Sequence, residues 1–205
     1  MQILGKKHDY STFVKWMEIL NEEEEKNFGS IQTESLAFFT LLNLKRIQRL
    51  NKNIKVEANL LSTIKNLKSN QKWVVITEAW CGDSAQVLPV IAKFAEASEG
   101  KITLEIILRD ENPDWITKYH TNGSHSIPKL ISFDKAGNEL FVWGPRPIIA
   151  QSLFIDWKEN ESGRSWKDFE NELHTWYAKD KTQSTQIELQ QILEQYAKDD
   201  SSVSA

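Results

Sequence analysis

The chain has 205 residues, of which 40% are hydrophobic and 26% charged, and its net charge is −4 at pH 7. This balance is ordinary for a globular protein with a real core, and it gives no reason to expect binding to nucleic acid or to an anionic membrane. No apolar run has the length of a membrane span, and the N-terminus has no stretch of signal-peptide length.

Cysteine and histidine usage narrows the chemistry further. The single cysteine excludes an intramolecular disulfide framework and fits a reducing compartment, so we expect a cytoplasmic protein. The four histidines are scattered and show no metal-ligand spacing with the cysteine, so we expect no metal site.

Residues 1–70 read as a helical N-terminal extension. An apolar stripe at helical spacing begins at Phe13, and Ser11 or Thr12 could cap that helix. A break at Gly29 separates it from predicted helices over 33–50 and 53–69. The segment shows no strand-like alternation, so no opening strand is predicted.

Residues 71–160 alternate between strand and helix patterns. The run from Val74 to Ile76 predicts a buried strand, and the helical spacing from Ser84 predicts a helix after it. Further strands are predicted over 102–108, 129–133 and 139–143, with helices over 113–119 and 148–158. This order predicts an α/β fold with a mixed sheet flanked by helices.

Residues 161–205 read as C-terminal helices with a tail from Asp199. An amphipathic stripe runs from Trp166 to Tyr177, and one more apolar helix pattern follows. We expect all three segments to form one compact domain, because no low-complexity linker divides them.

The segment Trp80-Cys81-Gly82-Asp83-Ser84 places the only cysteine at the mouth of the predicted helix. There the unpaired N–H groups and the helix dipole lower a thiol pKa, whereas the charge of Asp83 raises it. Glu78 reads most simply as an exposed carboxylate.

This motif, followed by Pro89, Pro113, Ile127-Pro128 and the glycines at 137 and 144, resembles the thioredoxin family in order and spacing. The resemblance covers about residues 72–157 and implies a thioredoxin fold with helical extensions at both ends, as in a bacterial subgroup of thioredoxin-like proteins. It implies that Cys81 is the nucleophile, that Pro128 is cis, and that the backbone of Ile127 pairs with an extended substrate.

The resemblance also departs from the family pattern. Ser84 stands where a resolving cysteine is expected, and Val75 stands where thioredoxins carry a buried aspartate. The expected site therefore contains Cys81 and Ser84 as reacting groups, with substrate contacts from Trp80, Gly82, Asp83, Ile127, Pro128 and Arg146. Arg146 could hold a carboxylate, such as the glycine end of glutathione, or form a structural ion pair.

Three functions remain open at this point. The first is a monothiol exchange protein that forms mixed disulfides with protein thiols or with glutathione as an external thiol, an oxidoreductase without a resolving cysteine. The second is a redox-inactive module that binds peptides or proteins. The third is a glutathione-bridged iron–sulfur carrier, because Cys-Gly-Asp-Ser is similar to the monothiol glutaredoxin motif. We rank it last, since Trp80 precedes the cysteine.

Overall fold

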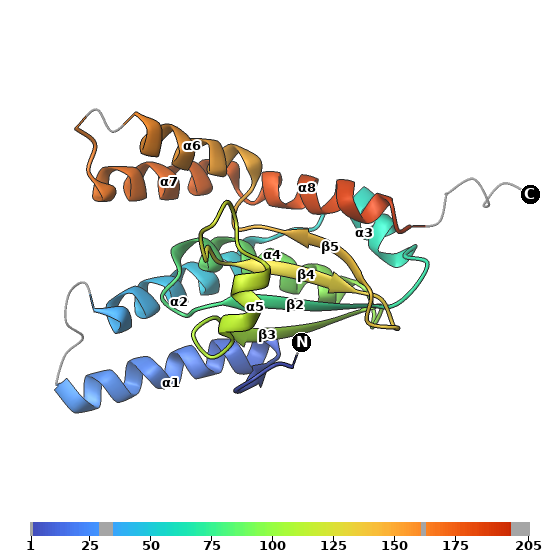
Figure 1. The fold of residues 1–205 in the computed structure, drawn as a ribbon, viewed down its shortest axis with the longest axis horizontal. Helices are drawn as coiled ribbons and strands as arrows, with labels where there is room; N and C mark the ends of the chain where they lie inside the picture. Colours follow the sequence, from blue (N-terminus) through green and yellow to red (C-terminus); the bar gives the residue numbers. More distant parts are fainter. Residues whose placement is uncertain (1, 29–34, 161–162, 198–205) are drawn as a thin grey trace, which may run out of the picture.

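The computed structural model of the protein describes residues 2–28, 35–160 and 163–197. The predicted break at Gly29 and the tail from Asp199 lie outside these residues. Figure 1 shows one central sheet with most of the helices above and behind it and the chain termini on different sides. The strands lie in the order β1-β3-β2-β4-β5.

The centre of the sheet is β2 (Gln71–Thr77), which carries the apolar run that the sequence predicts as a buried strand. It pairs in parallel with β3 (Ile102–Leu108) and antiparallel with β4 (Lys129–Phe133), and β4 pairs antiparallel with β5 (Glu139–Trp143). Its side chains are buried on both faces of the sheet, Trp73 and Val75 in one hydrophobic cluster and Val74 and Ile76 in a second, so apolar residues suit both faces.

The prediction that the chain has no opening strand is wrong. A two-residue strand, β1 (Lys7–His8), pairs antiparallel with β3 through Lys7 opposite Ile107. Two residues are too short to show an alternating pattern, and tertiary pairing with β3 creates this strand.

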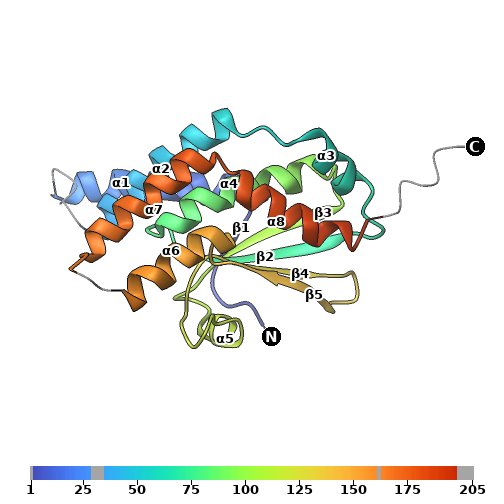
Figure 2. The same ribbon diagram turned by 90° about the horizontal axis from the view of Figure 1, so that it is seen from above.

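Seven helices among the described residues lie on one face of the sheet (Figure 2). They are α1 (Tyr10–Phe28), α2 (Leu36–Asn53), α3 (Ala58–Lys65), α4 (Gly82–Ala97), α6 (Ile148–Glu159), α7 (Trp166–Asp180) and α8 (Gln183–Glu194). Asp9, and neither Ser11 nor Thr12, caps α1, because its side chain accepts from the N–H of Thr12. The third helix is shorter than the predicted 53–69, because the backbone is extended at Ile54 and at Glu57, the cap residues between α2 and α3, and α3 ends at Lys65.

One hydrophobic core joins the three predicted segments. It includes Phe13 and Ile47 from the first, Val75 and Phe94 from the second, and Phe169 from the third, each at most 1% exposed. Burial on this scale is the main stabilising contribution to a fold. Side chains from all three segments are therefore buried together in this core.

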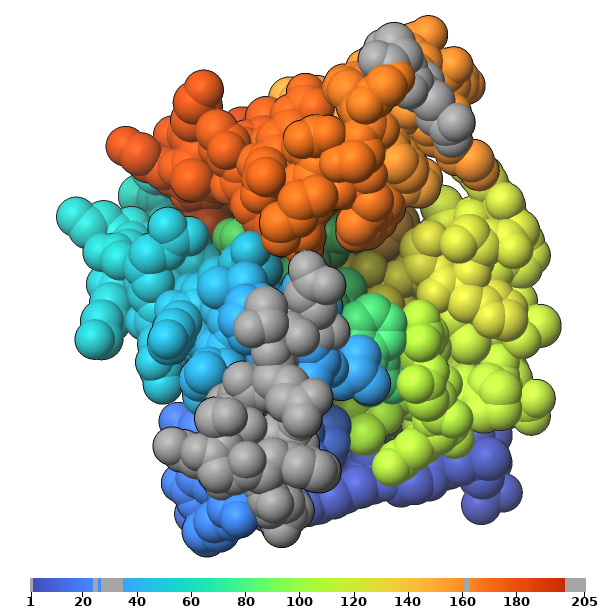
Figure 3. All heavy atoms as spheres, turned by 90° about the vertical axis from the view of Figure 1, so that its left-hand side faces the viewer, coloured from blue at the N-terminus to red at the C-terminus, as the bar shows by residue number. Residues whose placement is uncertain are grey.

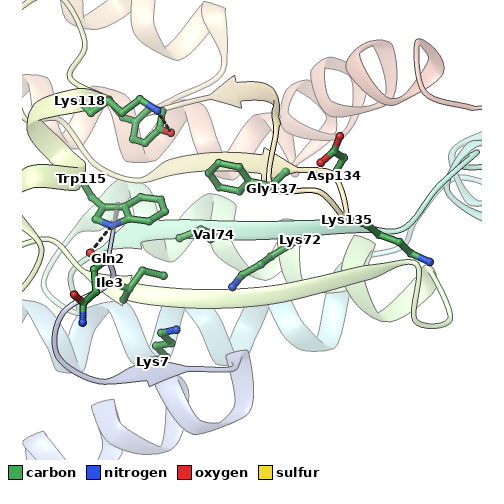
Figure 4. Close-up of a pocket in the computed structure, with 12 residues that line it drawn as sticks. Gln2, Ile3, Lys7, Lys72, Val74, Trp115, Lys118, Asp134, Lys135 and Gly137 are labelled. Carbon is green, nitrogen blue, oxygen red and sulfur yellow. Dashed lines mark hydrogen bonds between the residues drawn. The ribbon is translucent and has the colours of Figure 1, made fainter.

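The opposite face of the sheet has a lighter cover. Of the described helices, α5 (Pro113–Lys118) lies there, beside the N-terminal residues, as Figure 2 shows. Trp115 donates from its indole N–H to the carbonyl of Gln2 at 3.1 Å, which holds these two parts together. Next to them is a cavity of about 680 Å³, which is lined by Lys72 and Val74 of β2 and by Lys7 of β1 (Figure 4).

Candidate thiol site at the first turn of helix α4

Cys81 lies at the N-cap of α4, in the turn that follows β2, and only 7% of the residue is exposed. Figure 3 looks onto this end of the molecule, where the green turn before α4 lies between α2 in blue, the yellow-green loop before β4 and the C-terminal helices in orange. The Cys81 Sγ lies 3.5 Å from the carbonyl oxygen of Ile127, toward which the thiol donates. The Ile127–Pro128 peptide bond is cis.

The Cys81 thiol is poorly placed to ionise. Burial, and next the charge of Asp83, raise the pKa of Cys81 to about 11, although hydrogen bonding from Ser84 and the backbone N–H groups of the helix partly opposes them. About one thiol in ten thousand is then ionised at pH 7. The N–H groups and the dipole at the N-terminus of α4 lower the pKa of Cys81 by less than burial and the Asp83 carboxylate raise it.

Ser84 lies in the first turn of α4, three residues after Cys81, and is 3% exposed. Its Oγ accepts a hydrogen bond from the Thr77 hydroxyl at 2.6 Å, so its own proton is available to the Cys81 sulfur. Trp80, the residue before the cysteine, holds the guanidinium of Arg109 over its ring at 4.9 Å. Both contacts fix the turn on either side of the sulfur.

Asp83 and Arg146 are brought together in a buried ion pair. The Arg146 Nε donates to Asp83 Oδ2 at 2.7 Å, and the two side chains are 11% and 8% exposed. Tyr177, from α7, donates its hydroxyl to the other carboxylate oxygen at 2.8 Å. Burial raises the pKa of Asp83, and the charge of Arg146 and the bond from Tyr177 oppose this rise. The first turn of α4 is thus tied to the C-terminal helices.

Glu78 is not the exposed carboxylate that the sequence predicts. It is 7% exposed, and its Oε1 accepts from the backbone N–H of Asp110 at 2.9 Å. Burial raises its pKa, while the Asp110 N–H opposes the shift. The reason for the wrong prediction is its position at the end of β2, where the loop after β3 covers it.

His174 and Arg46 belong to the site although the sequence analysis does not include them. A Cβ added to Gly82 would lie 2.9 Å from His174 Nε2 and 3.5 Å from Arg46 Nη1, so both side chains lie against the residue after Cys81. Burial, followed by the positive charges of Arg46, Lys167 and Arg146, lowers the pKa of His174 to about 3. His125, by contrast, is exposed and lies 3.5 Å from the Thr117 hydroxyl.

Acid is expected to weaken the fold through His174. The pKa of His174 is about 3 in the folded protein, below the value of about 6.5 for a histidine in the unfolded chain. As the pH falls below about 6.5, the unfolded chain therefore takes up a proton that the folded protein does not, and the free energy of unfolding decreases. Because His174 is partly exposed, we expect the free energy of unfolding to fall by about 1–2 kcal/mol more in wild type than in His174→Gln between pH 7.5 and pH 4.5. Urea unfolding at both pH values measures this difference. His125→Gln, in an exposed loop, should behave as wild type, and equal losses in wild type and His174→Gln would contradict the expectation.

Comparison with known proteins matches this fold and site. A family model described as thioredoxin matches residues 29–158. The thioredoxin of Alicyclobacillus acidocaldarius is 42% identical over 78 residues, which make up 37% of this chain and 70% of that protein. Thioredoxin 1 of a Nostoc strain is 38% identical over 77 residues, or 36% of this chain and 68% of that protein. The chain therefore belongs to the thioredoxin family, and this membership supports a role in thiol–disulfide exchange in general.

Two solved structures share the fold over nearly the whole chain. A protein of unknown function from Pseudomonas aeruginosa superposes with a TM-score of 0.60 at 18% identity and covers 93% of both chains. An HIV epitope scaffold has a TM-score of 0.55 at 17% identity, covering 93% of this chain and 100% of its own. The predicted thioredoxin fold with helical extensions is confirmed.

The described residues contain neither a metal-binding cluster nor a helix that could cross a membrane. No group of three or more His, Cys, Asp or Glu side chains there could hold a metal ion. None of the helices described has both the length and the apolar character that a membrane crossing requires.

Proposed function

We propose that the protein performs monothiol exchange, in which Cys81 forms a mixed disulfide with a partner that binds in extended form along the backbone of Ile127. The observation that carries this proposal is the 3.5 Å approach of the Cys81 sulfur to the Ile127 carbonyl oxygen. A polypeptide that paired with this backbone would bring its own sulfur to Cys81, as in strand addition. Pro128 and Trp80 would flank it. Membership of the thioredoxin family supports the same chemistry.

The exchange needs one protein sulfur and one external thiol. The Cys81 thiolate attacks a partner disulfide, a new S–S bond forms, the old one breaks, and the second partner sulfur leaves as a thiolate that takes up the proton lost by Cys81. The sequence has one cysteine, and the Ser84 hydroxyl cannot resolve the mixed disulfide. The thiolate of an external thiol such as glutathione then attacks the partner sulfur and forms a disulfide with it. The Cys81–partner bond breaks, and Cys81 leaves as a thiolate that takes up the proton lost by the external thiol, a step that suits a reducing compartment such as the cytoplasm.

The raised pKa of Cys81 makes this exchange slow in both directions. Few thiolates are present for attack, and the greater nucleophilicity of a more basic thiolate compensates only in part. A basic thiol is also a poor leaving group, so the mixed disulfide, once formed, persists. The site therefore suits capture of a bound partner better than rapid turnover.

A redox-inactive binding module is the second candidate, and the burial of Cys81 favours it. In this reading the partner binds along Ile127 and no S–S bond forms. The two candidates differ in one measurable property, since only the first requires the sulfur.

A peptide that carries its cysteine as a thiopyridyl disulfide tests the proposal. We expect intact-mass spectrometry to show one peptide attached to each wild-type molecule and none attached to the Cys81→Ser variant. Glutathione should remove the attached peptide slowly. Absence of adduct together with unchanged partner binding by Cys81→Ala would favour the redox-inactive module.

A further inference from the structure

A groove runs between α2 and α7, the helices that the two extensions contribute beside the thiol site. Its first part is a cleft of about 670 Å³, and its second part is a cleft of about 330 Å³. Ala178 lines both clefts, so they adjoin at this residue. Leu42, Leu50 and Ile54 supply apolar surface along it. We call this feature the α2–α7 groove.

The lining of the α2–α7 groove is strongly basic although the whole chain has a net charge of −4. It contains one acidic residue, Glu170, and five cationic residues: Arg46, Arg49, Lys167, Lys179 and Lys181. Glu170 pairs with Lys167 at 3.0 Å. Within the described part of the chain, the other four cations have no acidic partner within ion-pair distance. The lining of the groove thus carries more positive than negative charge, and four of its five cations have no ion-pair partner among the described residues.

Helix-end electrostatics explains only part of this charge. Lys179 lies in the last turn of α7, where a cation is favourable, but Lys167 lies in its first turn, where the helix dipole opposes a positive charge. Arg46 lies inside α2 and not in its last turn. The C-terminal end of α7 therefore accounts for Lys179 and for Lys181, its C-cap, but helix ends do not account for Arg46 or Lys167.

The groove begins at the thiol site. Arg46 and His174 both line its first cleft, and both lie against Gly82, the residue after Cys81. Tyr177 lines the second cleft while its hydroxyl holds Asp83. A chain lying in the groove would therefore reach the first turn of α4.

We propose that the α2–α7 groove binds an acidic polypeptide segment of the partner whose cysteine reacts with Cys81. This inference rests on the proposed function and adds the substrate class: partners with aspartate or glutamate near the reacting sulfur. Complementary charge raises the rate of encounter and selects among partners. Single-stranded nucleic acid fits less well, because the lining contains no Phe or Trp and its one tyrosine, Tyr177, is buried and not open for base stacking.

Three thiopyridyl disulfide peptides of equal length test the groove, with glutamates, lysines or glutamines around one cysteine. We expect the glutamate peptide to form the mixed disulfide about tenfold faster than the lysine peptide at low salt, and this preference to shrink at high salt. The double variant Arg49→Gln/Lys179→Gln should lose most of the preference while reacting normally with the glutamine peptide. A matched double variant, Lys15→Gln/Lys158→Gln, removes two exposed lysines from α1 and α6 and should keep the preference.

The outcomes separate this inference from the proposed function. Equal rates for all three peptides, or equal effects of the two double variants, would contradict binding of an acidic segment in the α2–α7 groove but would not contradict monothiol exchange. If no peptide reacts, fluorescence anisotropy with the labelled glutamate and lysine peptides measures binding without chemistry, and equal affinities would overturn the groove. Tighter binding of a single-stranded oligonucleotide than of the glutamate peptide would overturn the assignment to a polypeptide.

Discussion

Asp83→Ala is expected to lower the free energy of unfolding by about 3–5 kcal/mol, because it leaves the buried Arg146 charge and the Tyr177 hydroxyl without their partner. This is a large part of the stability of a typical domain. Urea unfolding followed by tryptophan fluorescence measures the change. Arg146→Ala should cost a similar amount, since it leaves the Asp83 carboxylate buried and unpaired.

A double-mutant cycle assigns this loss to the ion pair. Asp83→Ala/Arg146→Ala should be less destabilised than the sum of the single variants, because neither charge is then left alone. Asp114→Ala removes an exposed acid from the first turn of α5 and should cost below about 1 kcal/mol. Additive single effects, or an equal loss in Asp114→Ala, would contradict the assignment.

Gly144→Ala is expected to destabilise the fold by roughly 3–5 kcal/mol and to abolish partner capture. Gly144 has a φ of +107°, and an added Cβ would lie 2.5 Å from the backbone carbonyl oxygen of Pro128. Backbone atoms cannot rotate away, so the loop that carries Ile127 and Pro128 would have to move. Thermal unfolding and the mass assay for the Cys81 adduct measure the two effects.

Gly137→Ala separates the clash from the strained dihedral angle. Gly137 also has a positive φ, +86°, but an added Cβ would meet nothing within 4 Å. It should cost about 1–2 kcal/mol and leave capture intact. If the two alanine variants behave alike, contact with Pro128 has no special role.

Local patterns were enough to predict much of the fold. The bounds of β3, β4 and β5 agree with the predicted strands, because each is a short run of β-forming residues between turn signals. The start of α3 was wrong by several residues, since helix ends depend on capping and tertiary contacts. The strand β1 exists only through its pairing with β3 and has no local signal.

Some contacts of the candidate site could likewise be predicted from the sequence, and others depend on tertiary structure. The resemblance indicated Cys81 and Ile127, and the structure brings them together. The contact of Tyr177 with Asp83 joins residues 94 positions apart, and no local pattern indicates it. The position of Tyr177 on the apolar stripe of α7 predicted burial but not its partner. Glu78 was predicted to be exposed because the loop after β3, which buries it, lies far from it in the sequence.

Titration of the Cys81 thiolate by ultraviolet absorbance, with Cys81→Ser as the blank, shows whether burial keeps this thiol protonated at neutral pH. We expect a pKa of about 11 in wild type and a lower value in Asp83→Asn, because that variant removes the second largest cause of the rise. We also expect alkylation by iodoacetamide at neutral pH to be slower than for free cysteine. A wild-type pKa below about 7 would show a thiol poised for rapid attack, and would contradict slow capture by a buried thiol.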